Sequence, residues 1–281
     1  MNQANTSRIG RRFAELRASG DLGLVAFVTA GDPTLDASET ICLAIADAGA
    51  DVIELGVPFS DPVADGPTIQ RSSERALRGG VNLAAVIGLV RRLRAKTQVP
   101  LVLFSYFNPV LQMGLEEFAA AAAEAGADGA LLTDVTPEES TDYIAAMRAK
   151  NLDTVFLGAP TSSDERLKAI ASVSSGFLYL ISRTGVTGAK DSLAEDLPAF
   201  LRRARRTTSL PLAVGFGISL PGHVSVLGGL ADAAVVGSAL VSEIERAPDA
   251  GAAASAVAEK VRALKLAGRK GMSIRSAEAG S

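Results

Sequence analysis

The fold is decided by Ala48-Gly-Ala-Asp51-Val-Ile-Glu54-Leu-Gly-Val-Pro-Phe-Ser-Asp-Pro-Val-Ala-Asp65-Gly-Pro-Thr-Ile-Gln70, a stretch in which a helix end, an apolar strand and a proline-stiffened loop follow one another. A strand that follows a helix in this way usually belongs to a parallel sheet, whose ligands gather at the carboxyl ends of its strands. Glu54 lies near that end of the apolar run. We therefore expect its carboxyl group to face a pocket rather than bulk water.

Short runs of β-branched or apolar residues recur along the whole chain, and mostly amphipathic segments separate them. Eight such alternations are what a (β/α)8 barrel requires, so we predict an α/β protein with a TIM-barrel fold. A doubly wound open sheet shows the same alternation and stays open as an alternative. The predicted strands are residues 24–29, 52–57, 101–106, 129–134, 154–158, 177–182, 212–217 and 233–237.

Three of the joints between a helix and the next strand have similar sequences. They are Ala48-Gly-Ala-Asp51, Ala125-Gly-Ala-Asp128 and Gly229-Leu-Ala-Asp232. This similarity indicates recurrent βα units rather than a solenoid repeat of 20–50 residues.

The length and composition predict one domain. The chain has 281 residues, of which 48% are hydrophobic and 21% charged, enough to bury a full-sized core. We expect residues 1–281 to form a single TIM-barrel domain. Ile9, Phe13 and Leu16 fall near one helical face, which predicts an extra helix within about residues 1–20 that covers the N-terminal end of the barrel. About residues 266–281 form a C-terminal tail in this interpretation, for which flexibility is one expectation.

Charge and composition exclude several classes of function. A net charge of −3 provides no general basic field, so we expect neither nucleic acid nor a membrane surface as a partner. The N-terminus lacks a secretory signal, no apolar run could span a bilayer, and Cys42 is the only cysteine, which together favour a soluble cytoplasmic protein. No metal-ligand spacing is present, and His223, the only histidine, is expected to be an exposed residue at a helix start.

Two glycine turns after the last two strands predict a phosphate site. Gly215-Phe-Gly217-Ile-Ser and Gly237-Ser238-Ala fall where barrels often bind phosphate through backbone N–H groups and a helix N-terminus. Chain reversal alone would explain either turn by itself. After the sixth strand, residues 183–196 are rich in Gly, Thr and charge, which is typical of a lid over a barrel mouth, or of a disordered linker.

Glu54 and Asp65 are the candidates for proton transfer. Apolar neighbours would raise the pKa of Glu54 toward a value useful for acid–base work, unless the residue is an ordinary salt-bridged acid. Asp65, like Asp61, stands beside Gly or Pro, where turn formation alone explains an aspartate. Tyr106 and Tyr179 lie at or within predicted strands, either as core rings or as hydroxyl groups that contact a substrate.

Four segments, taken together and in order, resemble the tryptophan synthase alpha chain family. They are Phe27-Val-Thr-Ala-Gly-Asp-Pro33, the residues from Glu54 to Gln70 quoted above, Ser182-Arg-Thr-Gly-Val-Thr-Gly188 and Gly215-Phe-Gly-Ile-Ser219. The resemblance runs through nearly the whole chain. The second segment is distinctive, whereas glycine turns of the last kind recur in many phosphate-binding barrels.

The resemblance implies a lyase of tryptophan biosynthesis. Its reaction is the retro-aldol cleavage of indole-3-glycerol phosphate to indole and D-glyceraldehyde 3-phosphate, without a cofactor in this chain and without a metal. Glu54 matches the family's catalytic glutamate, and moving protons to indole C3 and from the adjacent hydroxyl fits it. Asp65 matches the catalytic aspartate, whose carboxylate would stabilise charge at the ring N–H.

The resemblance also implies substrate-binding residues and a partner. Phe27 and Tyr106 would line the indole pocket, and Tyr179 would lie near Glu54. The partner would be the tryptophan synthase beta subunit, which holds pyridoxal phosphate and receives indole in a complex of two alpha and two beta chains. Loops near residues 58–62 and 108–114 would form much of the contact. Thr187 would belong to the closing loop, and the phosphate site would comprise Gly188, Gly217, Gly237 and Ser238.

Two other functions stay open at this point. Another phosphate-binding barrel, such as a pentose-phosphate epimerase or isomerase, would explain the glycine turns but not the segment from Glu54 to Gln70. A catalytically weak subunit that mainly activates its beta partner is the other, and intact Glu54 and Asp65 argue against it.

Overall fold

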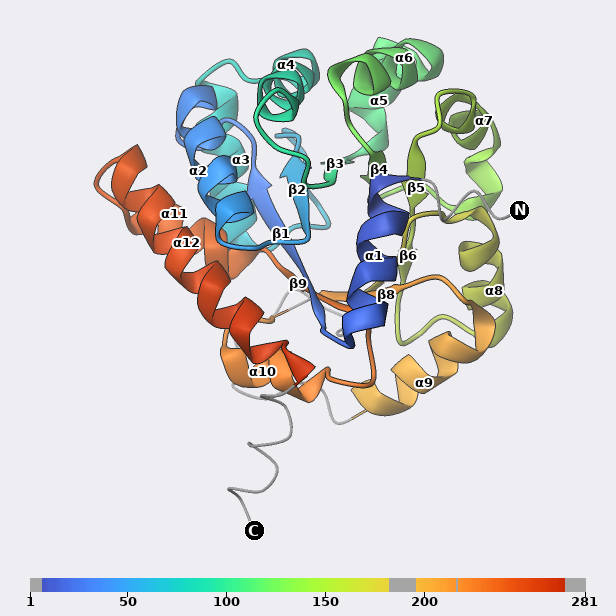
Figure 1. Cartoon of the computed structure of the whole chain (residues 1–281). Helices are drawn as coiled ribbons and strands as arrows, with labels where there is room; N and C mark the ends of the chain where they lie inside the picture. The colour runs from blue at the N-terminus through green and yellow to red at the C-terminus, as the bar shows by residue number, and fades with distance from the viewer. Residues whose placement is uncertain (1–6, 182–195, 216, 271–281) are drawn as a thin grey trace.

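The computed structural model describes residues 7–181, 196–215 and 217–270. Helices and parallel strands alternate along this part of the chain (Figure 1). The strands are β1 (Gly23–Thr29), β2 (Val52–Gly56), β3 (Leu101–Ser105), β4 (Gly129–Leu132), β5 (Asp153–Val155), β6 (Leu157–Gly158), β7 (Leu178–Ile181), β8 (Leu212–Gly215) and β9 (Ala233–Val236). The helices are α1 (Arg8–Ser19), α2 (Leu35–Asp47), α3 (Pro67–Arg78), α4 (Leu83–Arg94), α5 (Phe107–Met113), α6 (Leu115–Ala125), the 3₁₀ helix η2 (Pro137–Glu139), α7 (Thr141–Ala149), α8 (Asp164–Val173), α9 (Leu197–Thr207), α10 (Pro221–Val226), α11 (Ser238–Arg246) and α12 (Ala250–Ala267).

The strands form a nearly closed barrel. Their order is β5-β4-β3-β2-β1-β9-β8-β7-β6, and each described pair is parallel. Only Phe156 separates β5 from β6, so these two segments together fill the fifth of the eight strand positions, where we expected one continuous strand over residues 154–158. The carbonyl of Phe156 accepts a hydrogen bond from the Tyr179 N–H at 3.1 Å. The TIM barrel is confirmed, and the open sheet is excluded.

Helix α1 closes the N-terminal end of the barrel, as the spacing of its apolar residues predicts. Ile9, Phe13 and Leu16 are buried and pack into the cluster that fills the barrel interior, and the Phe13 ring lies 5.7 Å from the Phe177 ring. The Ser7 side chain caps the helix by accepting a hydrogen bond from a backbone N–H. Figure 1 shows α1 lying across the strands, with the other helices around them. A second, larger hydrophobic core lies between the outer face of the strands and these helices, and both contribute residues to it.

The recurrent aspartates of the helix–strand joints have one structural role. Each precedes one strand and accepts a hydrogen bond from a backbone N–H at the start of the neighbouring strand, so each ties two strands together at the N-terminal end of the barrel. This confirms that the joints mark recurrent βα units. The bonds run from Leu24 N to Asp51 at 2.6 Å, from Leu101 N to Asp128 at 2.8 Å and from Leu212 N to Asp232 at 2.8 Å.

The remaining expectations about the chain have mixed outcomes. Cys42 is fully buried, and burial raises the pKa of its thiol to about 12, so it is inert.

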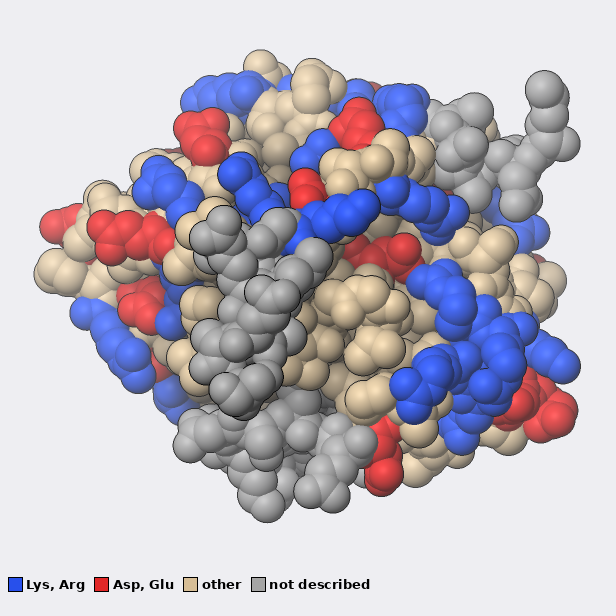
Figure 2. Space-filling view, turned by 60° about the horizontal axis from the view of Figure 1, so that its bottom comes forward, with Lys and Arg blue, Asp and Glu red and all other residues tan. Residues whose placement is uncertain are grey.

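Within the described ranges, no helix is long and apolar enough to cross a membrane. Acidic and basic side chains are interspersed on the face drawn in Figure 2, apart from one denser group of Lys and Arg. Helix α12 ends at Ala267, and residues 271–281 of the expected tail lie outside the described residues.

Candidate active site

Glu54 lies inside the barrel near its mouth. It stands two residues after Val52 on β2, so the alternation of side chains along a strand directs both toward the interior. Glu54 is 0% exposed, and neither carboxyl oxygen has a hydrogen-bond partner in the parts of the chain that the structure describes. Because burial penalises the charged form, the pKa of Glu54 is raised to about 8. The result is a carboxylic acid that still holds its proton at neutral pH.

Asp65 lies half-buried in the loop between β2 and α3. Its backbone N–H donates to the Pro62 carbonyl at 3.0 Å, and its own carbonyl accepts from the Gln70 side chain at 2.9 Å, so the loop is folded back onto α3. Burial raises the pKa of the Asp65 carboxyl to about 6, although the hydrogen bond from Tyr106 lowers it. At neutral pH Asp65 is therefore ionised whereas Glu54 is protonated.

Tyr106 holds the Asp65 loop against the end of β3. Its hydroxyl donates to Asp65 Oδ2 at 3.2 Å and accepts from the Ala64 N–H at 2.9 Å. Its ring is 3% exposed and stacks on Phe59 with 5.0 Å between the ring centroids. Burial and the nearby Asp65 charge raise the pKa of Tyr106, so it stays a neutral hydrogen-bond donor.

Tyr179 on β7 is close enough to both acids to respond to their charges. Its pKa is raised well above the usual value, first by burial and then by the charges of Glu54 and Asp65. A Cβ atom placed on Gly215 would lie only 2.2 Å from the Tyr179 hydroxyl oxygen, so glycine is needed there to leave room for the ring. The structure thus brings Glu54, Asp65 and Tyr179 to one end of the barrel.

Phe27 connects the acid site to the region of the glycine turns. It is directly opposite Glu54 in the β1–β2 pair and is 5% exposed. A Cβ on Gly56 would lie 2.6 Å from its ring and one on Gly237 would lie 3.4 Å from it, so both glycines pack closely around the ring. Phe104 meets Phe27 edge-to-face at 5.1 Å. An apolar wall therefore lies beside the buried carboxyl group.

The predicted phosphate residues are partly described. Gly217 adopts a left-handed conformation with φ of 79°, Gly237 immediately precedes α11, and Ser238 is the exposed first residue of that helix. Strands β8 and β9 are neighbours, so both turns lie on the same side of the mouth. Thr187, Gly188 and residues 183–195 of the predicted lid lie outside the described residues.

Sequence reasoning missed three contributors to the site. Phe59 supports Tyr106, Phe104 supports Phe27, and Gln70 holds the Asp65 loop. The period-two pattern of β3 could have indicated Phe104, because Val102 and Phe104 share its inward face. The pairing of an aromatic residue on the loop with one at a strand end leaves no local sequence signal.

Three other aspartates near the mouth have different roles. Asp134 accepts a hydrogen bond from the Phe107 backbone N–H at 2.7 Å, at the start of α5. Asp32 is buried and pairs with Arg75. Asp61 is exposed, and its carbonyl accepts from the Val63 N–H within the loop.

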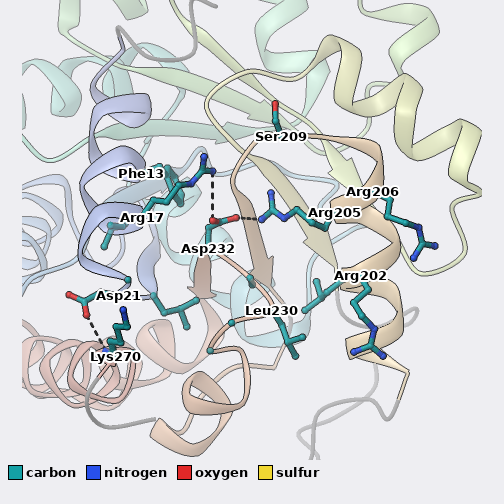
Figure 3. Close-up of a pocket in the computed structure, with 18 residues that line it drawn as sticks. Phe13, Arg17, Asp21, Arg202, Arg205, Arg206, Ser209, Leu230, Asp232 and Lys270 are labelled. Carbon is teal, nitrogen blue, oxygen red and sulfur yellow. Dashed lines mark hydrogen bonds and ion pairs between the residues drawn. The ribbon is translucent and has the colours of Figure 1, made fainter. Parts of the chain in front are cut away.

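A hollow of about 960 Å³ lies at the opposite, N-terminal end of the barrel (Figure 3). It contains none of the predicted site residues. Asp232 at its edge pairs with Arg205 and lies 4.0 Å from Arg17, while Asp21 accepts a hydrogen bond from the Lys270 backbone N–H. The acids around this hollow thus have partners within the chain.

The expectation for His223 was wrong. It lies in the first turn of α10 but is only 7% exposed, and its Nδ1 atom accepts a hydrogen bond from the Ser219 N–H at 3.3 Å. The local sequence places this ring at a surface turn, but α10 packs against α12, which is distant in the sequence. In the described residues there is no group of three or more His, Cys, Asp or Glu side chains that could hold a metal ion.

Comparison with known proteins places this geometry in a family. The family model for the tryptophan synthase alpha chain matches residues 13–269. The chain is 52% identical over 240 residues to the tryptophan synthase alpha chain of Solibacter usitatus (strain Ellin6076), which covers 85% of this chain and 90% of that one. It is 50% identical over 260 residues to that of Roseiflexus sp. (strain RS-1), with coverage of 92% and 99%.

Solved structures agree with this result. Tryptophan synthase subunit alpha from Legionella pneumophila str. Paris matches with a TM-score of 0.86 and 34% identity, covering 93% of this chain and 98% of that one. A structure of Mycobacterium tuberculosis tryptophan synthase matches with a TM-score of 0.86 and 35% identity, covering 94% and 98%.

Proposed function

The chain belongs to the tryptophan synthase alpha chain family, and on this premise we propose how its residues carry out the reaction. The enzyme is a lyase of tryptophan biosynthesis that cleaves indole-3-glycerol phosphate to indole and glyceraldehyde 3-phosphate. The alpha reaction uses no cofactor, and pyridoxal phosphate belongs to the beta partner. We therefore look for the proton donor and acceptor among the side chains of this chain.

The chemistry requires one net movement of a proton. Indole C3 accepts a proton, which leaves the ring nitrogen electron-poor. The hydroxyl on the adjacent glycerol carbon then loses its proton and becomes a carbonyl, while the carbon–carbon bond breaks and its electron pair restores the aromatic indole. The catalyst therefore needs a group that gives a proton and takes one back, and a negative charge near the ring N–H.

In our proposal Glu54 is the group that gives and takes the proton. The observation that carries it is a fully buried carboxyl group without a described partner, whose pKa is raised to about 8. A general acid works best when its pKa lies near the working pH, and this one lies close to neutrality. A resting carboxyl group without partners among the described residues also leaves both oxygens available to the substrate.

Asp65 is the electrostatic partner in this proposal. Its pKa of about 6 keeps it ionised at neutral pH, and Tyr106 orients it through a hydrogen bond of 3.2 Å. A fixed carboxylate beside the indole N–H would stabilise the positive charge that develops after protonation of C3. Phe27 and Tyr106 supply apolar surfaces for the indole ring, and Tyr179 lies next to both acids.

We assign the phosphate group to Gly217, Gly237 and Ser238, together with Gly188 of the loop outside the described residues. Thr187 of the same loop is assigned to the approach toward Asp65. The start of α11 supports this assignment, because unpaired backbone N–H groups at a helix N-terminus attract anions. Phe27 touches the Gly237 backbone region on one side and is paired with Glu54 on the other, so one substrate could extend between the two regions.

The beta subunit is the proposed partner, in a complex of two alpha and two beta chains. The two loops expected at the contact line one hollow of about 600 Å³, which includes Pro58 and Pro109. Two exposed apolar side chains belong to or directly follow these loops in the sequence, with Val63 at 73% and Leu111 at 55% exposure. Apolar side chains at these exposures are suited to burial in an interface. A cytoplasmic location, which the sequence favours, remains part of the proposal.

Indole release by purified protein tests the catalytic assignment. Wild type and Glu54→Gln would be assayed with indole-3-glycerol phosphate, with and without a beta subunit. We expect the substitution to lower kcat by about 10²–10⁴-fold in both settings, because it removes the proton donor and acceptor. Equal rates for wild type and variant would contradict the assignment. If wild type and variant were both inert but still activated the beta subunit, the chain would be a binding subunit instead.

Titration with a beta subunit tests the interface. Leu111→Asp should weaken binding at least tenfold, because it would place a charge in an apolar contact. Leu266→Asp is the matched control, since Leu266 on α12 is similarly exposed, at 47%, but lies away from these loops. Equal affinities for the two variants would place the interface elsewhere.

A further inference from the structure

Arg75 on α3 joins three elements that each carry part of the proposed site. Its guanidinium group binds Asp32 with two bonds of 2.8 Å, one to each carboxyl oxygen, and it binds Glu245 with a third of 2.8 Å. Asp32 lies in the loop after β1, and Glu245 lies on α11. The planar guanidinium holds Asp32 with two parallel bonds and still has an N–H group for Glu245, whereas a lysine ammonium cannot form the parallel pair.

Each of the three elements leads directly to site residues. Strand β1, before Asp32, carries Phe27, and the loop before α3 carries Asp65. Helix α11 begins at Ser238, in the proposed phosphate region. The junction that Arg75 forms with Asp32 and Glu245 therefore connects the elements at the indole end of the site with the helix at its phosphate end.

Further hydrogen bonds make these connections stiff. The Thr29 and Ser72 hydroxyl groups lie 2.6 Å apart and link the end of β1 to α3. The Gln70 side chain, five residues before Arg75 on the same helix, holds the carbonyl of Asp65. A shift of α3 would therefore move the Asp65 loop with it.

The two arms of the junction differ in burial. Asp32 is 2% exposed, and in the described ranges Arg75 is its cationic partner. Glu245 is more exposed and also binds Arg71 with bonds of 2.8 and 2.7 Å. Removing Arg75 would leave Asp32 buried without a cation, whereas Glu245 would keep Arg71. Losing one partner of a buried pair is far more disruptive than losing one of an exposed pair.

From this arrangement we propose that Arg75 is a positioning residue for the lyase reaction, which sets the distance between the Asp65 loop and the phosphate end of the site by holding Asp32 and Glu245 together. The inference rests on the proposed assignment of Asp65 and Ser238. A displacement of about 1 Å in a positioned group can lower a rate by up to about 10²-fold.

The test compares Arg75→Met with Arg71→Met, since both arginines lie on α3 and bind Glu245 but only Arg75 binds Asp32. Indole release would be measured with the beta subunit present, well below the Tm of each variant. We expect kcat/KM to fall at least tenfold for Arg75→Met and to stay within twofold of wild type for Arg71→Met. Equal values for the two variants would overturn the inference, whereas a wild type without activity would overturn the proposed function as well.

A double variant separates positioning from stability. In Arg75→Met with Asp32→Asn, the buried side chain no longer carries an unpaired charge, so we expect Tm to recover toward wild type. The link to α3 is still absent, so kcat should stay low. Recovery of kcat together with Tm would show that Arg75 only stabilises the fold. Arg75→Lys should lie between wild type and Arg75→Met, because an ammonium group restores the charge without the two parallel bonds.

Discussion

Two buried carboxyl groups close together in the sequence have opposite surroundings. Asp51 immediately precedes β2 and Glu54 is the middle residue of that strand, and they are 1% and 0% exposed. Asp51 accepts hydrogen bonds from Arg12, from the Leu24 N–H and from the Lys265 ammonium. Glu54 has no partner among the described residues.

The contrast extends to the two ends of the barrel. At the N-terminal end, Asp128 also binds two arginines and a backbone N–H, so its charge is neutralised within the protein. At the C-terminal end, burial raises the pKa of both Glu54 and Asp65. A buried acid with full partners ties strands together, whereas a buried acid without them is available to a substrate. Hydrogen-bonding and ionic partners, rather than burial, distinguish the acids that tie strands together from the acids that are available to a substrate.

The largest expected effect concerns the stability of Glu54→Gln as a function of pH. The pKa of Glu54 is about 8 in the folded protein against 4.5 for a free glutamate, so its contribution to stability is complete below pH 4.5 and is lost as pH rises through 8. Glutamine has no such loss. The stability advantage of the variant should therefore grow by roughly 4 kcal/mol between pH 4.5 and 8, at 1.36 kcal/mol per pKa unit. Denaturant unfolding across this range measures it, and a difference that stays constant with pH would contradict the raised pKa.

Asp51→Asn should give the opposite result. It leaves Arg12 and Lys265 without their buried carboxylate, so we expect the free energy of unfolding to fall by about 3–5 kcal/mol. The value of kcat, measured where the variant is folded, should stay within about twofold of wild type. Asp128→Asn, at the joint before β4, serves as the control and should behave alike. If Asp51→Asn lost activity without losing stability, the acids at the two ends of the barrel would not have separate structural and catalytic roles.

The pH dependence of kcat/KM should show two limbs. Activity needs ionised Asp65 and protonated Glu54, so it should rise with pH through about 6 and fall above about 8. Beyond each limb the change approaches about tenfold per pH unit.

A variant identifies the lower limb, because the substrate phosphate also titrates near pH 6. In Asp65→Asn the limb should disappear from the residual activity if Asp65 causes it. A limb that persists belongs to the substrate. An upper limb absent up to pH 9 would contradict the role of Glu54 as the acid.

The smallest effect is expected where a carboxylate pairs on the surface. Arg91 and Glu124 lie 3.4 Å apart, with side chains 59% and 80% exposed. Arg91→Ala should change the free energy of unfolding by less than about 1 kcal/mol, because water and salt screen such a pair. Thermal unfolding beside Asp51→Asn provides the comparison. An effect as large as that of Asp51→Asn would show that pairing alone, without burial, accounts for stability.

Much of the fold could be predicted because its signals are local. The eight alternations predict the barrel, and the apolar stripe of α1 predicts a helix at its base. The break at Phe156 and the burial of His223 were not predicted, because both depend on how distant elements pack. The site was predicted less completely. Glu54 and Asp65 stand in a distinctive segment, whereas the support from Phe59 and the junction at Arg75 arise only in three dimensions.

The barrel, the inward direction of Glu54 and the family follow from the amino-acid sequence alone, because periodicity and motifs are properties of neighbouring residues. Three-dimensional packing was needed to give Asp51 its cationic partners and to leave Glu54 without a partner among the described residues. The partners of Asp51 come from Arg12, 39 residues before it, and Lys265, 214 residues after it. The electrostatic environment of a side chain depends on distances in space. The local sequence around two acids that lie three residues apart therefore does not indicate which of them a distant cation will reach.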